Sequence, residues 1–168
     1  MNASYYQLVV EGNICILKNL LHLLDKAVEH AIANKIEERA LLDARLFPDM
    51  WPLIRQIRMV CDSTRNTASM LTGKDAPKFD DNETSFAELK ARISNSISYL
   101  NAFGENDFRD SAEREVRLPW IPDIAYRGEV FLLRFAIPNI YFHMTTVYNL
   151  LRHNGVPIGK ADYLGKVG

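Results

Sequence analysis

The segment PNIYFHMTTVYNLLRHNG, residues 138–155, carries an asparagine and a histidine four residues apart. Helix positions at this spacing lie one turn apart on the same face, so Asn139 and His143 share an otherwise apolar stripe. Two interpretations fit the pair. Either the two side chains are buried and satisfied by bonding each other or a hydroxyl such as that of Thr146, or they line a site in which the imidazole acts as a base near neutral pH.

As a metal site, this pair is incomplete. An amide oxygen is a poor ligand for the borderline metals that imidazole favours, and tight sites use about three protein ligands or more. The sequence has no His-x-x-x-His, His-Glu-x-x-His or Glu-x-x-His pair. His22 and His30 lie two helical turns apart, and the helix dipole accounts for His153 in a last turn. We therefore expect no tightly bound metal unless a carboxylate such as Asp49 or Asp62 completes the set.

Asp49 and Gln56 are the other candidates for a site. Asp49, in PDMWP, has the place of a helix cap, and that role alone could account for it. It is also close in sequence to Trp51 and Gln56, whose side chains could reach the mouth of a helix bundle. The same region carries charged residues at three-and-four spacing, which indicates a solvated, ion-paired face more than an anion site. These residues are Arg55, Arg58, Asp62 and Arg65.

Long helices must position these residues. Apolar side chains at three-and-four spacing predict helices over residues 5–34 and 52–73, with a short helical turn at 37–43 between them. A third helix begins at the capping box formed by Ser85 and Glu88, in which each side chain can satisfy a free backbone N–H group. The fold therefore starts with three amphipathic helices.

The connections and the last helix complete the prediction. Residues 73–84, GKDAPKFDDNET, read as a polar surface loop, and residues 113–128 alternate around two prolines as a short irregular hairpin does. A fourth helix follows Gly128, ends near Asn154 and is expected to kink at Pro138. We predict an all-α four-helix bundle with a hairpin insert between helices three and four, formed as a single domain by residues 1–168.

Composition narrows the class of protein. With 168 residues, 48% hydrophobic and 24% charged, and a net charge of -1, the chain is typical of one globular domain and has no basic surplus for nucleic acid or anionic lipid. No cationic region precedes an apolar run at the start, and the longest apolar stretch is too short to cross a bilayer. Cys15 and Cys61 fall in apolar helical patterns, as buried free thiols do. We expect a cytoplasmic protein that binds neither nucleic acid nor membrane.

Three segments carry a family resemblance: LFPDMWPLIRQ, CDSTR and NIYFHMTTVYNLLRHNGVPIGKADYLG. Together with the helix order, they resemble the domain-of-unknown-function family numbered nineteen ninety-three, in the DinB-like/YfiT-like superfamily, over nearly the whole chain. The resemblance implies an up-down-down-up bundle, often dimeric. It also implies a divalent metal such as zinc or nickel, held by one histidine from helix two and a His-x-x-x-His pair from helix four. Metal-bearing relatives include thiol-dependent S-transferases and hydrolase-like enzymes.

The chain departs from that metal-site pattern. His143 matches the second histidine of the helix-four pair, and Asn139 stands where the first should be. In helix two, the corresponding segment RQIRMVCD, residues 55–62, has no histidine. His143 is then the only residue that matches a ligand of the superfamily, which implies a remodelled metal site.

Two classes of function fit these observations. The first is a small-molecule-binding protein, or a hydrolase- or transferase-like enzyme, with a bundle pocket lined by His143, Asn139, Asp49 and Gln56; His143 would be its only general base near neutral pH. The second is a non-catalytic dimeric scaffold or a stress-response interaction protein. An open pocket at His143 favours the first class and a closed core the second. A homodimer is expected from the resemblance and from surplus apolar residues on the first helix, Val10, Leu21 and Leu23.

Overall fold

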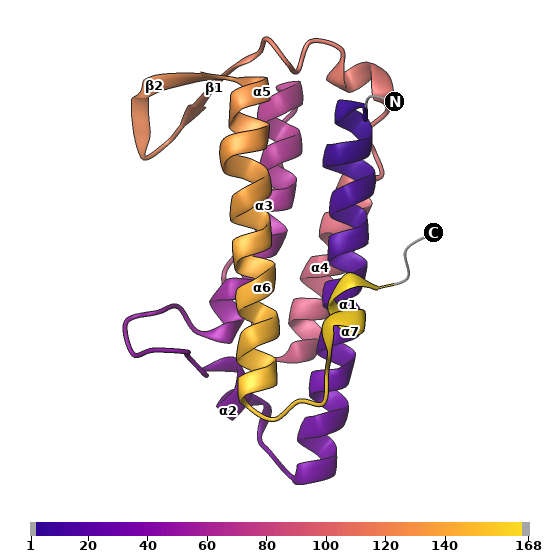
Figure 1. Cartoon of the computed structure of the whole chain (residues 1–168), viewed down its shortest axis with the longest axis vertical. Coiled ribbons are helices and arrows are strands. Elements are labelled where there is room, and N and C mark those ends of the chain that lie inside the picture. The colour runs from indigo at the N-terminus through magenta and orange to yellow at the C-terminus, as the bar shows by residue number, and fades with distance from the viewer. Residues whose placement is uncertain (1–2, 166–168) are drawn as a thin grey trace.

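The computed structural model describes residues 3–165 as an assembly of long helices with one small hairpin (Figure 1). The long helices are η1 (Gln7–Glu11) with α1 (Gly12–Asn34), α3 (Leu53–Thr72), α4 (Phe86–Leu100), and α5 (Gly128–Phe131) with η3 (Leu132–Ala136) and α6 (Ile137–His153). The short elements are α2 (Glu38–Leu42), η2 (Glu105–Phe108), the strands β1 (Glu115–Leu118) and β2 (Ile121–Arg127), and α7 (Lys160–Leu164). The predicted all-α bundle with a hairpin insert is confirmed.

Local sequence signals set several helix ends. Gly73, with φ 77°, ends α3 in the left-handed conformation that favours glycine. Ser85 and Glu88 form the predicted capping box, in which Ser85 Oγ accepts from the Glu88 N–H at 3.2 Å and the Glu88 carboxylate accepts from the Ser85 N–H at 3.2 Å. The prediction that Asp49 caps a helix was wrong. The residue that precedes α3 is Pro52, and no side chain caps that end.

The bundle has an up-down-down-up order, with α3 and α4 parallel to each other (Figure 1). The first N–H of α4, on Phe86, donates to the Glu38 carboxylate of α2 at 3.0 Å, so α4 begins at the end of the bundle where α3 begins. At the opposite end, Ser111 Oγ donates to the Leu71 carbonyl at 2.8 Å, which joins the end of α3 to the segment after α4. α3 packs against both α4 and α6, and α4 packs against α1.

One apolar core lies between the four long helices. A fully buried leucine or isoleucine stabilises the fold by about 1.5–3 kcal/mol relative to an exposed one. Each long helix contributes several buried residues, including Leu17, Leu20, Ile57, Val60, Leu89, Ile93, Val147 and Leu151. Val10 and Leu23 are also in this core and Leu21 is half-buried, so the prediction that they form surplus apolar surface was wrong.

The two cysteines lie in different surroundings. Cys61 is buried, as predicted, and burial raises the pKa of its thiol to about 12. Cys15 is exposed on α1, against the prediction. The apolar pattern around Cys15 marks the helix as amphipathic but does not decide on which side of the stripe that one residue falls.

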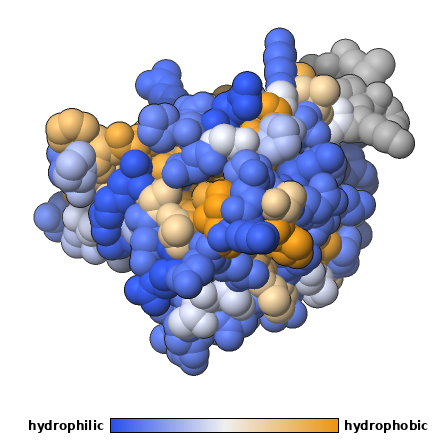
Figure 2. Space-filling view, turned by 90° about the horizontal axis from the view of Figure 1, so that it is seen from below, coloured by the Kyte–Doolittle hydropathy of each residue, from blue (hydrophilic) through white to orange (hydrophobic). Residues whose placement is uncertain are grey.

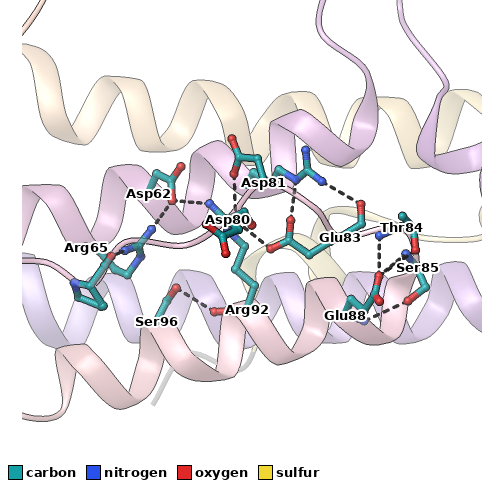
Figure 3. Close-up of polar contacts among 12 residues, drawn as sticks. Asp62, Arg65, Asp80, Asp81, Glu83, Thr84, Ser85, Glu88, Arg92 and Ser96 are labelled. Carbon is teal, nitrogen blue, oxygen red and sulfur yellow. Dashed lines mark hydrogen bonds and ion pairs between the residues drawn. The ribbon is translucent and has the colours of Figure 1, made fainter.

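A buried charge cluster holds the crossover segment, residues 73–85, along α3 and α4 (Figure 3). Because these two helices are parallel, the segment must return along the length of the bundle. Arg92 on α4 donates to Glu83 in the crossover segment at 2.8 Å and to Asp62 on α3 at 2.7 Å. Arg58 on α3 donates from Nε to the same Glu83 at 2.8 Å. The cluster therefore ties three parts of the chain together.

Arg65 extends the cluster. It pairs with Asp62, donates to the Pro77 carbonyl and places its guanidinium 3.8 Å from the centre of the Phe79 ring. The predicted ion pairing is present for Arg58, Asp62 and Arg65. The prediction that the face is solvated holds for Arg55, which is exposed, but was wrong for Arg65, which the crossover segment covers. Polarity along α3 shows only that these side chains are not in the apolar core.

The last long helix contains a π-helical turn, η3, directly before Pro138. Proline has no N–H group, and its ring would clash with the carbonyl four residues earlier in a regular α-helix. The Ile137 N–H donates to the Leu132 carbonyl five residues back, which relieves this conflict where the sequence predicts a kink. The extra residue in the turn rotates all later side chains by about 100°, and so helps to aim Asn139 and His143 toward α3.

Gly128–His153 is the one helix in the described part of the chain that is long and apolar enough to cross a membrane, and 44% of its most apolar window is buried. The core helix of a soluble protein passes the same test, so the property is weak evidence for a membrane. In the bundle this helix packs against α3. Figure 2 shows the lower end of the molecule as mostly hydrophilic, with separate hydrophobic patches.

Candidate functional site

A cavity of about 550 Å³ lies beside His143, between α3, α6, the loop before α3 and the tip of the hairpin. All four predicted site residues line it: His143, Asn139, Asp49 and Gln56. The remaining walls are aromatic rings and thioethers: Trp51, Trp120, Phe135, Phe142, Met50 and Met59. Residues about 90 positions apart in sequence thus meet in one apolar hollow with a few polar groups, which is the usual composition of a ligand pocket.

His143 is fixed in the wall by a chain of hydrogen bonds. Its Nδ1 lies 2.7 Å from Gln56 Oε1, and Gln56 Nε2 donates to the Trp51 carbonyl at 3.4 Å. Because the second contact uses the amide nitrogen, the amide oxygen faces the ring, and Nδ1 carries the proton and donates. Nε2 then has a lone pair, and none of residues 3–165 forms a hydrogen bond with it. The Trp51 ring lies parallel to the imidazole, within 5°, with 5.9 Å between ring centres.

Burial controls the charge of His143. The side chain is 4% exposed, and desolvation lowers its pKa from 6.5 to about 4. At pH 7 the ring is therefore neutral. A base with this pKa is weak near neutrality, which differs from the predicted role as a general base. What the geometry provides instead is an oriented hydrogen-bond acceptor at Nε2.

Asn139 does not bond His143. Asn139 Nδ2 donates to Ser63 Oγ on α3 at 2.9 Å, and the Thr146 hydroxyl donates to the Phe142 carbonyl at 2.7 Å. The prediction that the pair, or Thr146, satisfies His143 was wrong, because His143 and Asn139 find their partners on α3 and Thr146 bonds within α6. Asn139 Oδ1 makes no hydrogen bond to a described residue, and it is a second acceptor beside the cavity.

Asp49 lies at the exposed rim of the cavity, in the loop before α3. Its neighbour Trp51 is held from two directions, since the Arg55 guanidinium lies 3.8 Å from the centre of the Trp51 ring and His143 stacks parallel to the same ring. The rim of the cavity thus carries the Asp49 carboxylate beside the oriented ring of Trp51. The spacing of charges along α3 does not indicate that Arg55 helps to hold the Trp51 ring at this rim.

The residues at the site do not fit the divalent metal that the resemblance implied. Gln56, Asn139 and His143 come from the second and fourth long helices, as the superfamily ligands do, but two of the three are amides. Gln56 Oε1 also accepts from His143, which directs its lone pair at a proton. Among the described residues, no group of three or more His, Cys, Asp or Glu side chains could hold a metal ion.

The fold and the site together define an up-down-down-up four-helix bundle with a pocket between its second and fourth long helices. The model of the family described as Domain of unknown function (DUF1993) matches residues 5–164, so the chain belongs to this family. The chain is also similar to the crystal structure of a DinB family member protein from Shewanella denitrificans. That structure is 43% identical, with a TM-score of 0.93, and the match covers 96% of this chain and 92% of that one. No curated protein matches the chain.

Proposed function

We propose that the protein binds, without a metal, a small aromatic molecule that carries hydrogen-bond donors, in the cavity around His143. One observation carries the proposal. A neutral imidazole is locked through Nδ1 by Gln56, so that the lone pair on Nε2 is free in a cavity with aromatic walls. An open cavity also supports binding over a purely scaffolding role.

The polar groups of the cavity favour donors on the ligand. His143 Nε2, Asn139 Oδ1 and the Asp49 carboxylate are all acceptors, and none of them is used by a hydrogen bond to a described residue. His143 and Asn139 lie one turn apart, about 5–6 Å between their Cβ atoms, which suits a single compact ring. The aromatic walls favour a flat apolar body, because rings in contact add to the stabilisation from buried area.

The protonation state of His143 supports binding more than catalysis. A general base works best when its pKa lies near the working pH, and burial lowers that of His143 to about 4. Ser63, a hydroxyl on the same side of α3, already accepts from Asn139. A hydrolase- or transferase-like reaction would need an additional group, whereas binding needs only the acceptors that are in place.

Intrinsic fluorescence tests this proposal directly, because both tryptophans of the chain, Trp51 and Trp120, line the cavity. Phenol is a suitable probe, as an aromatic ring with one donor. We expect it to change the emission saturably, and the His143→Leu variant to bind it about tenfold more weakly, as expected for one lost hydrogen bond. His153→Leu is the matched control, an exposed histidine on the same helix. Equal affinities in wild type and His143→Leu would rule out the proposed role.

Two further properties belong to the proposal. We propose a homodimer that uses the face formed by η1 and the outer sides of η3 and α6, where Leu133 and Tyr141 are 54% and 48% exposed and Leu8 lies beside Tyr141. A cytoplasmic location is supported by the cysteines, since Cys15 and Cys61 are both free.

A further inference from the structure

We infer that the ligand cavity continues into a second, apolar subsite beneath the hairpin, which takes a short alkyl extension of the aromatic ligand. The inference rests on the proposed function and adds to it the shape of the ligand. A cavity of about 130 Å³ lies next to the first one along α3 and α6. The two share four wall residues, Met59, Trp120, Phe135 and Asn139, so only these side chains divide them.

The walls of the second cavity favour hydrocarbon. Apolar side chains from the hairpin, the last long helix and α3 form most of it, among them Leu118, Pro119, Phe131, Ala136 and Met70. Two of its three polar side chains from α3 are engaged in hydrogen bonds, and the third, Asn66, is exposed. Thr67 Oγ1 donates to the Ser63 carbonyl at 2.6 Å, and Ser63 Oγ accepts from Asn139 at 2.9 Å. Against the apolar wall a polar extension would lose its hydration, and it would find a partner only at Asn66 or Asn139, whereas an alkyl chain loses nothing.

Of the side chains between the two cavities, Trp120 is the one that can move most easily. It lies in the turn between β1 and β2, is 64% exposed and contacts Phe135 with 5.9 Å between ring centres. The hairpin has two strands, and their register shifts between Arg117 and Leu118, next to this turn. Val116 and Leu118 anchor β1 in the core, whereas the Trp120 side chain in the turn is largely exposed. A movement of that side chain is thus enough to let one ligand occupy both cavities.

The volume sets the length of the extension. At about 30 Å³ for each non-hydrogen atom, the value for liquid water, the second cavity holds about four atoms. We therefore expect affinity to rise with chain length up to a butyl group and then to level off. A buried methylene adds about fourfold in affinity.

A series of para-alkylphenols tests the subsite: phenol and its para-ethyl, para-butyl and para-hexyl derivatives, titrated by tryptophan fluorescence. In wild type we expect about fourfold tighter binding per methylene up to butyl. Ala136→Leu, which fills the subsite from a buried position, should reduce the ratio of butylphenol to phenol affinity to near one. Met70→Ala, which enlarges the same cavity, should extend the gain to hexyl. Thermal unfolding checks that each variant is folded.

The outcomes separate the inference from the proposed function. Phenol binding that depends on His143, with no gain along the series, overturns the subsite and leaves the function. A chain-length gain that Ala136→Leu and Met70→Ala do not change also overturns the subsite, because the chain then binds elsewhere. If Ala136→Leu does not fold, Met70→Ala decides alone. Failure of phenol to bind, while butylphenol binds independently of His143, overturns the proposed function and keeps the apolar subsite.

Discussion

His143 owes its properties to three neighbours. Gln56 Oε1 accepts a hydrogen bond from the Nδ1–H group, Trp51 stacks on the ring, and Phe142 meets it edge-on with 5.2 Å between ring centres. Together they remove the ring from water while they satisfy only one of its nitrogens. An arrangement that served stability alone would be expected to satisfy both. The ring with the unused nitrogen lines a cavity, which is where a ligand donor would be placed.

Burial of His143 predicts a specific loss of stability in acid. The folded-state pKa is about 4 and the ordinary value is 6.5, so the unfolded chain binds more protons between these values. The stabilisation is therefore complete above pH 6.5 and is lost as the pH falls toward 4. Between pH 7 and 4.5, we expect wild type to lose about 2 kcal/mol more of its free energy of unfolding than His143→Leu.

Urea denaturation at the two pH values measures this difference. The comparison between variants cancels the carboxylates, which also titrate in this range. His153→Leu should behave as wild type, because the His153 side chain is exposed. If wild type and His143→Leu lose the same stability, His143 is not held neutral by burial.

The remodelled site also predicts that metal binding can be restored. Gln56, Asn139 and His143 occupy the helices that supply three histidines in the resembling superfamily, so the double variant Gln56→His, Asn139→His should present three imidazoles. We expect it to retain stoichiometric zinc or nickel after dialysis against a mild chelator, measured by elemental analysis. Wild type should retain none. Stoichiometric metal in wild type would contradict the amide-based interpretation of the site.

The residues of the site were more predictable than their contacts. Helical spacing places Asn139 and His143 on one face, and all four candidates line the same cavity. Their partners depend on how α6 is rotated against α3, and the π-helical turn before Pro138 changes that rotation by one residue. Sequence periodicity does not reveal such a turn. It therefore could not show that His143 pairs with Gln56 instead of Asn139 or Thr146, or that Asn139 pairs with Ser63.

At the scale of elements, the crossover segment depends on charged contacts for its position. Thirteen residues, 73–85, run along two parallel helices with no regular structure of their own. The charge cluster of Arg92, Asp62 and Glu83 holds them where apolar residues are few. Removing one partner of such a cluster leaves the others charged and out of water, which is much more damaging than losing an exposed ion pair.

Arg92→Ala should therefore destabilise the protein by about 2–3 kcal/mol, because it removes a cation that is only 3% exposed and leaves Asp62 and Glu83 with one arginine each, Arg65 and Arg58. Lys90→Ala on the same helix is the control. It removes a pair with Asp25 in which both side chains are well exposed, and such pairs contribute about 0–1 kcal/mol. Chemical denaturation gives both values, and amide hydrogen exchange of residues 73–85 shows whether the segment is released. Similar costs for the two variants would mean that the cluster does not hold the segment.

The ends of elements were predictable because they depend on local chemistry. The Ser85–Glu88 capping box and Gly73 need no tertiary information. The burial of Arg65, in contrast, depends on tertiary structure. It arises because α3 and α4 pack in parallel, so that the connection between them must return over a charged face. A helix pattern gives the polar face of each helix but not the segment that covers it.

At the scale of the whole molecule, the last long helix is apolar on two sides. One side packs into the bundle, and the other carries Leu133, Ile137 and Tyr141 at four-residue spacing, the last two beside Leu8 of η1. The bundle was predictable from four amphipathic patterns, whereas this outer stripe was not separated from the core stripe, because both fall in one continuous apolar run. The surplus attributed to the first helix belongs here instead.

We propose that this stripe binds a second copy of the chain. The superfamily that the chain resembles is often dimeric. A net charge of -1 gives little repulsion between copies, and a stable interface needs about 800 Å² from each partner. We expect light scattering at micromolar concentration to give twice the 19.2 kDa of one chain. Tyr141→Glu should shift this to the monomer, because it places a charge in the apolar interface. Asn95→Glu, on the exposed side of α4, should leave the mass unchanged. Monomer mass for wild type would rule out the dimer, whereas a dimer that persists in Tyr141→Glu would place the interface on another face.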